Sequence, residues 1–122
     1  MAHQSTPLRI LVVGCGNMGA SHAVAYHSMD AFDICGLVAR GKSKETLNDK
    51  LGGGYALYND YEEALSVIKL DAVCISTYPD THEAYNVKAF QKGCHVFIEK
   101  PLADMVAGVE RVIAAGRKAN KN

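Results

Sequence analysis

Three glycines near the amino terminus have the spacing of a phosphate-binding turn. They follow the apolar run Ile10–Val13 directly and precede a segment with helical character. The first glycine permits a tight turn, the second a close backbone approach to a diphosphate, and the third close helix–strand packing. The free amides and positive dipole of a helix amino terminus attract phosphate groups. The run predicts a dinucleotide site, rather than a turn without a ligand, formed by Gly14, Cys15, Gly16, Asn17, Met18 and Gly19.

The segment after the second apolar run bears on which dinucleotide would bind. About 20 residues past the glycines, a carboxylate would accept hydrogen bonds from the ribose 2′-OH of NAD. The chain instead has Ala39 and Arg40 there, followed by Lys42, Ser43 and Lys44. Arginine can bind a 2′-phosphate with two N–H groups, but it can also stack on the adenine of either cofactor. Because the acid is missing, the sequence favours NADP as the cofactor, with NAD as the alternative. The other interpretation of these cations is that they only solvate the start of a helix. The predicted cofactor contacts are Ala39, Arg40 and Ser43.

Two further loops carry polar residues behind apolar runs. Ser76 to His82 follows one run, and Glu99-Lys100-Pro101 follows another. A lysine at a strand end can orient a hydroxyl, polarise a carbonyl and lower the pKa of a neighbouring acid. The alternative is a surface ion pair between Glu99 and Lys100 at a turn, worth about 0–1 kcal/mol. His82 fits the start of a helix better than a catalytic role.

The elements that would position these loops alternate along the chain. Runs that are apolar at every residue are typical of strands covered on both faces, and the segments between them carry helix start and stop signals. Ser43 and Asp60 are the expected helix caps. The order predicts an α/β fold, a Rossmann-type doubly wound parallel sheet whose strand ends meet at one edge. The expected strands are 10–13, 32–38, 55–58, 72–75 and 96–98. The expected helices are 16–28, 43–51, one that begins at 60, 80–92 and 103–118. In the last helix, the residues expected to face inward are Met105, Val109, Val112 and Ile113.

Composition narrows the classes of function. The 122 residues suit one domain, 1–122, and thirteen Lys and Arg balance thirteen Asp and Glu. A neutral chain has no global attraction to nucleic acid or an anionic membrane, and no apolar stretch is long enough to span a bilayer. Cysteines stand at 15, 35, 74 and 94 without metal-ligand spacing. The amino terminus has no apolar leader segment, so we expect a cytoplasmic protein whose cysteines are reduced thiols. No bound metal is expected.

Together the motifs resemble one family over nearly the whole chain from Leu8. The matching features are the glycine loop followed by His22, A-V-x-I-S-T-x-P-D-x-H at Ala72–His82, and K-G-x-H-V-F-I-E-K-P at Lys92–Pro101. The chain resembles the amino-terminal domain of the glucose–fructose oxidoreductase, inositol dehydrogenase and rhizopine-catabolism (Gfo/Idh/MocA) family. This resemblance implies NAD(P)-dependent oxidoreduction of a hydroxyl or carbonyl on a sugar, inositol or related polyol. It also implies that the full-length protein is a homo-oligomer.

The resemblance also implies roles for individual residues. Lys100 matches the family's catalytic lysine beside the nicotinamide, Glu99 would position it, and Pro101 would follow a cis peptide. Further cofactor contacts fall on Ser76, Thr77, Tyr78, Pro79, His82, Glu99 and Lys100. A sixth strand and a substrate domain would follow the last helix, so the chain reads as a nucleotide-binding part that is inactive alone. A non-catalytic NAD(P)-sensing regulator and an NAD-dependent glycosidase remain alternatives.

Overall fold

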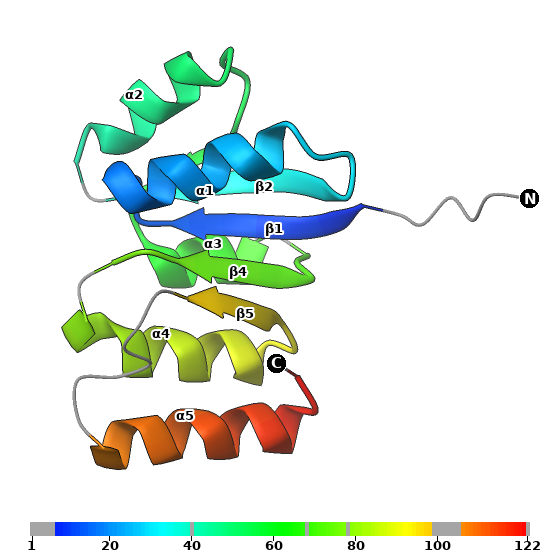
Figure 1. Ribbon diagram of the computed structural model, residues 1–122, viewed down its shortest axis with the longest axis vertical. Coiled ribbons are helices and arrows are strands. Elements are labelled where there is room, and N and C mark those ends of the chain that lie inside the picture. Colours follow the sequence, from blue (N-terminus) through cyan, green and yellow to red (C-terminus); the bar gives the residue numbers. More distant parts are fainter. Residues whose placement is uncertain (1–6, 40, 68, 78, 99–105, 122) are drawn as a thin grey trace, which may run out of the picture.

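Five parallel strands form a single sheet in the order β3-β2-β1-β4-β5 (Figure 1). The computed structural model describes residues 7–39, 41–67, 69–77, 79–98 and 106–121. The predicted doubly wound parallel sheet of about five strands is confirmed. The strands are β1 Leu8–Val13, β2 Phe32–Val38, β3 Leu57–Tyr58, β4 Ala72–Ile75 and β5 His95–Ile98.

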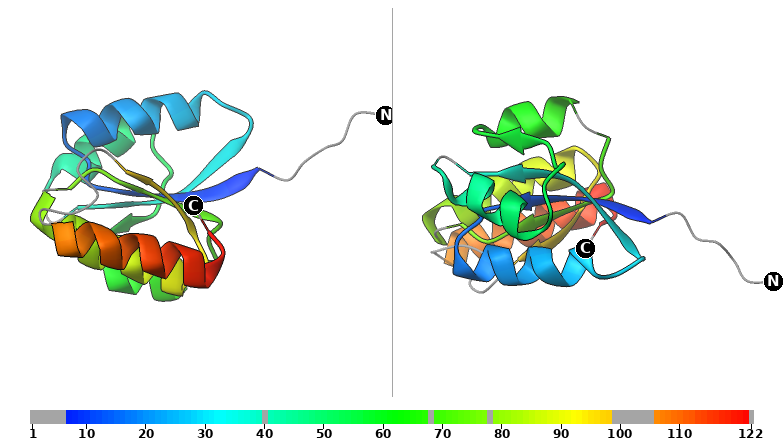
Figure 2. Two further views of the ribbon diagram at one scale, coloured as in Figure 1. Left: turned by 60° about the horizontal axis from the view of Figure 1, so that its bottom comes forward. Right: turned by 90° about the horizontal axis from the view of Figure 1, so that it is seen from above.

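Helices cover both faces of this sheet. Figure 2 shows α1 on one side and α4 and α5 on the other. As a result, Ile10 to Val13 of β1 are at most 1% exposed, and every residue of β4 is buried. This burial is what the uniformly apolar runs predicted. The helices are α1 Asn17–His27, α2 Ser43–Lys50, α3 Tyr61–Val67, α4 Pro79–Gln91 and α5 Val106–Ala119.

The side chains of alternate strand residues divide the core into two layers. Ile10 and Val12 pack with residues of α1 and α2, including Ala23 and Leu47. Leu11 and Val13 face the opposite way and pack with residues of α3 and α4. A shift of β1 by one residue against its neighbouring strands would exchange its two faces, so the register of β1 is strongly specified.

Two local predictions need correction. β3 begins at Leu57 rather than Tyr55, because the Tyr55 amide donates to Asn48 Oδ1 (3.1 Å) at the end of α2 instead of joining a neighbouring strand. Ser43 is the first residue of α2 and not its cap; the cap position is Lys42, which makes no side-chain capping bond. The Asp60 cap is confirmed, since its Oδ1 accepts a hydrogen bond from the Glu62 amide at 3.3 Å.

The last helix lies along α4 at the end of the sheet (Figure 1). Arg111 binds the Glu83 carboxylate of α4 through two nitrogens, with Nη2 at 2.8 Å from Oε1. Val112 is buried, at 3% exposed, whereas Ile113 is 43% exposed, so the face of α5 that was expected to point inward is only partly covered. The predicted inward Met105 lies outside the described residues. In the part of the chain that is described, no helix is long and apolar enough to cross a membrane.

Candidate functional site

The candidate loops meet at the carboxyl edge of the sheet. β1 lies between β2 and β4, so the chain leaves β1 where the strand order reverses. In open parallel sheets this switch point forms the crevice that takes ligands. The glycine loop follows β1 there, and the β2–α2 and β4–α4 loops lie on either side of it.

Two of the three glycines are required by the protein itself. Gly14 has a φ of +91°, and a Cβ there would lie 2.5 Å from the backbone oxygen of Ser76. A Cβ on Gly19 would lie 1.8 Å from the backbone oxygen of Gly14. Real Cβ atoms do not approach backbone this closely, so neither position tolerates a side chain without moving the loop.

Gly16 differs from both in having no such requirement. It caps α1 with a φ of −73° and is exposed, and a Cβ there would meet no atom of the described structure within 4 Å. Nothing in the packing demands glycine at this position. Open space beside a bare backbone is the arrangement that a close-approaching ligand needs.

The amino terminus of α1 is open to an anion. The first intrahelical bond runs from the Ala20 amide to the Gly16 oxygen at 2.7 Å, so the amides of residues 17 to 19 precede it. No side chain caps this helix, and its first turn contains no acidic residue. Such a terminus stabilises negative charge. The residues present therefore fit a diphosphate.

Cys15 contributes its backbone rather than its thiol. The side chain is 6% exposed, and Sγ donates to the Val38 oxygen at 3.6 Å. The same oxygen accepts the Gly14 amide at 2.8 Å, which ties the loop to β2. Burial raises the pKa of the Cys15 thiol from 9.0 to about 11, and the charge of Lys44 opposes part of that rise. The thiol is therefore protonated and unreactive at neutral pH.

The β2–α2 loop holds the residues that were expected to contact the adenosine ribose. Ala39 is half-buried and its amide donates to the Tyr58 oxygen at 3.1 Å; Ser43 is exposed; Arg40 lies outside the described residues. Lys44, which the run of cations did not single out, is only 6% exposed. The signal in the sequence was its helical spacing to the apolar Leu47 and Leu51, which are also buried.

The β4–α4 loop is supported from beneath by His82. The ring is 2% exposed, and Nε2 lies 3.0 Å from the Thr77 oxygen. A carbonyl can only accept, so Nε2 carries the proton and donates. Thr77 Oγ1 and Thr81 Oγ1 are 2.5 Å apart. Ser76 Oγ is buried without a hydrogen-bond partner among the described residues.

Several predicted residues can be placed only in part. Pro79 begins α4, and Asn17 and Met18 begin α1. Tyr78, Glu99, Lys100 and Pro101 lie outside the described residues, so the catalytic assignment stays a prediction. In the described ranges, no group of three or more His, Cys, Asp or Glu side chains could hold a metal ion.

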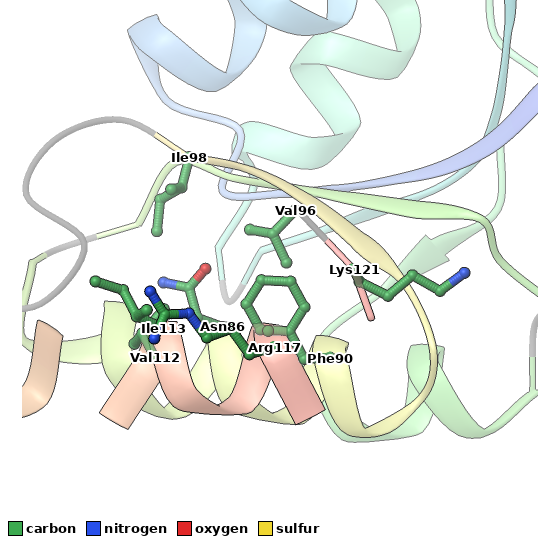
Figure 3. Close-up of a pocket in the computed structure, with 9 residues that line it drawn as sticks. Asn86, Phe90, Val96, Ile98, Val112, Ile113, Arg117 and Lys121 are labelled. Carbon is green, nitrogen blue, oxygen red and sulfur yellow. The ribbon is translucent and has the colours of Figure 1, made fainter. Parts of the chain in front are cut away.

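An apolar groove lies away from these loops, at the β5 end of the sheet (Figure 3). Its volume is about 290 Å³, and it is bordered by β5, α4 and α5. Val96 and Ile98 point into it from β5, opposite Phe90 of α4 and the exposed Ile113 of α5. The exposure of Ile113 follows from its place on this groove. β4 separates β5 from β1, and the groove lining includes no residue of the glycine loop, so the two sites are distinct.

The sheet order, the glycine turn and the uncapped α1 terminus define a Rossmann-type nucleotide-binding domain. The pattern of the Gfo/Idh/MocA family, described as an oxidoreductase family with an NAD-binding Rossmann fold, matches residues 8–122. The chain belongs to this family, as the motifs predicted.

The chain is similar to proteins of about three times its length. Inositol 2-dehydrogenase of Salmonella typhimurium is 31% identical over 118 residues, which cover 93% of this chain and 34% of that protein. GenD2 from gentamicin A biosynthesis, solved with NAD, has a TM-score of 0.87 and 26% identity, covering 98% of this chain and 34% of that one. KijD10, a 3-ketoreductase from Actinomadura kijaniata solved with NADP, shares the fold, with a TM-score of 0.84, 23% identity, and coverage of 95% and 37%.

Proposed function

We propose that the chain binds a nicotinamide dinucleotide, with its diphosphate over the glycine loop. The observation that carries this proposal is Gly16, a glycine at the mouth of the site where the protein's own packing needs none. The proposed diphosphate contacts are Gly14, Cys15, Gly16, Asn17, Met18 and Gly19. Backbone amides at the start of α1 would bind the phosphate oxygens, and the buried Cys15 side chain would hold the loop against β2.

NADP is the proposed cofactor, with NAD as the alternative. The end of β2 offers no carboxylate at Ala39 or Arg40 to accept a ribose 2′-OH. Arg40 and Ser43 would contact the 2′-phosphate, since a guanidinium binds phosphate through two hydrogen bonds. GenD2 was solved with NAD and KijD10 with NADP, so both choices occur among similar proteins.

The nicotinamide would lie toward the β4–α4 and β5–α5 loops. Nicotinamide, when bound, supplies hydride-transfer chemistry. Ser76, Thr77, Tyr78, Pro79 and His82 would form its wall, with His82 acting through its bond to the Thr77 oxygen. Lys100 would be the catalytic residue: an ammonium at this strand end can orient a substrate hydroxyl and polarise a carbonyl. Glu99 would hold that lysine in place.

The proposed activity of the full-length protein is NADP-dependent oxidoreduction of a sugar, inositol or related polyol. The Salmonella relative is an inositol 2-dehydrogenase. This chain spans 34% of that relative's length. Residues 1–122 would form the nucleotide-binding domain of such a protein. We therefore expect no NADPH formation when the chain alone is mixed with NADP and polyols. A cytoplasmic location and a homo-oligomeric full-length protein belong to the same proposal.

Titration with both dinucleotides tests this proposal. We expect NADP to bind more tightly than NAD by calorimetry, and Arg40→Ala to reduce the affinity for NADP alone. Lys118→Ala, on the exposed face of α5, is the matched control for loss of one positive charge. The absence of binding by either dinucleotide would refute the proposed function. Tighter binding of NAD, with no effect of Arg40→Ala on NADP, would refute the preference for the 2′-phosphate.

A further inference from the structure

One face of α5 carries an apolar residue between two opposite charges. Glu110, Ile113 and Arg117 follow one another at spacings of three and four residues, so they form one row along the helix. All three are exposed, and Ile113 is 43% exposed. α5 packs on α4 through another face, which includes the buried Val112 and Gly116. The row is therefore a second face of the helix, and α4 does not cover it.

The two charges of this row have no ion-pair partner within the described part of the chain. Four residues along the helix, Glu110 meets Ala114 and Arg117 meets Ile113, so α5 itself supplies no opposite charge. The neighbouring Arg111 is already bound to a carboxylate of α4. Both charges of the row are thus available to another molecule.

The row borders the apolar groove between α5 and β5. Figure 3 shows Ile113 and Arg117 on α5 at this groove, with Val96 and Ile98 on β5. β5 is the last strand in the sheet order, so its outer edge has no neighbouring strand among the described residues. Apolar strand edges that are left open tend to associate with another chain. A molecule bound to the row would lie over this groove as well.

We propose that the row is a contact surface for a second copy of this chain, with the two α5 helices antiparallel about a two-fold axis. Glu110 and Arg117 are equally distant from the point between residues 113 and 114. An axis at that point brings Ile113 against Ile113 of the second copy and sets each Glu110 against Arg117 of the other copy. The row is therefore self-complementary in charge, whereas a parallel pair of helices would place like charges together.

This contact surface lies away from the glycine loop, since no residue of that loop lines the groove. The inference gives the proposed homo-oligomer a surface, but it does not require dinucleotide binding. Two helices in contact form a small interface, so we expect a reversible dimer that dissociates in the micromolar range.

Sedimentation equilibrium of the chain over a range of concentrations tests this surface through its charges. Glu110→Arg and Arg117→Glu each replace two attractive contacts by repulsive ones, so each should weaken the dimer about tenfold or more. The double variant exchanges the charges and should restore the dissociation constant to within about threefold of the original. Lys118→Glu, an exposed residue outside the row, is the matched control for charge reversal and should have little effect.

A further variant tests the apolar centre of the contact. Ile113→Asp should remain monomeric at every concentration, and because Ile113 is exposed it should unfold in urea like the unmodified chain. A monomeric unmodified chain, a dimer that neither reversal weakens, or a double variant as weak as the single ones would overturn the proposal, and another occupant would then cover the groove. NADP should bind Ile113→Asp as it binds the unmodified chain. Failure of the unmodified chain to bind NADP or NAD would remove the proposed function but not this surface.

Discussion

Alanine substitution of the three loop glycines separates the requirements of the fold from those of the ligand. At Gly16 the added methyl meets nothing within 4 Å and the φ of −73° suits alanine. Loss of the glycine cap costs about 0.5–1 kcal/mol, and the lower entropy of the unfolded chain returns about 0.4–1 kcal/mol. The free energy of unfolding of Gly16→Ala should therefore remain within about 1 kcal/mol of that of the unmodified chain.

The effect of Gly16→Ala on binding should be much larger than its effect on stability. The methyl would occupy the space through which the diphosphate approaches the amides of α1. Loss of one hydrogen bond to a charged group costs about 1.5–3 kcal/mol, or roughly 10- to 100-fold in the dissociation constant for NADP. Calorimetric titration and urea unfolding measured on the same samples would give both quantities.

Gly14→Ala and Gly19→Ala serve as the matched comparison, with the opposite expectation. Their methyl groups would lie 2.5 Å from the Ser76 oxygen and 1.8 Å from the Gly14 oxygen. Overpacking costs about 1–3 kcal/mol, and the positive φ of Gly14 adds about 1–2 kcal/mol for alanine. If Gly16→Ala bound NADP within twofold of the unmodified chain, or lost as much stability as Gly19→Ala, the assignment of Gly16 to the ligand would be wrong.

Three further predictions concern side chains of the site, of the core and of the groove. Because burial raises the pKa of Cys15 to about 11, its contribution to stability is complete below pH 9 and is lost as the pH rises toward 11; urea unfolding at pH 8 and 10.5 should show a smaller loss in Cys15→Ala. Leu11→Ala should lower the free energy of unfolding by about 2–5 kcal/mol, whereas Ile113→Ala should change it by less than about 1 kcal/mol; similar losses would contradict their different burial. His82→Ala should cost about 1–3 kcal/mol by leaving the Thr77 oxygen without its donor, and His82→Gln should recover part of this; equal stability of both variants with the unmodified chain would show the contact to be unimportant.

The parallel sheet and the positions of the loops followed from the sequence because both rest on short-range signals. A run such as Ile10–Val13 is apolar at every residue only when helices cover both faces of its strand, and right-handed crossovers then bring the strand ends to one edge. The glycine spacing predicted the turn after β1 for the same reason. Glycine is required at positions 14 and 19 because a side chain at either position would collide with a backbone oxygen.

The failures arose where a side-chain contact or an uncovered surface decides the outcome. Asn48 binds the Tyr55 amide and so shortens β3, a contact that no local pattern announces. Ile113 has the helical spacing of a core residue, but periodicity identifies only the apolar face of α5 and not whether that face is covered. Spacing alone therefore overestimated the burial of α5.

Lys44 shows why the chemistry of a site needs burial as well as residue type. In the sequence it is one of several cations after β2, and Lys42 and Lys44 are indistinguishable by charge. In the structure Lys42 is exposed, whereas Lys44 is buried with Leu47 and Leu51 on the inner face of α2. A buried ammonium fixed by the Gly41 oxygen occupies one defined position, so burial separates two lysines that residue type cannot tell apart.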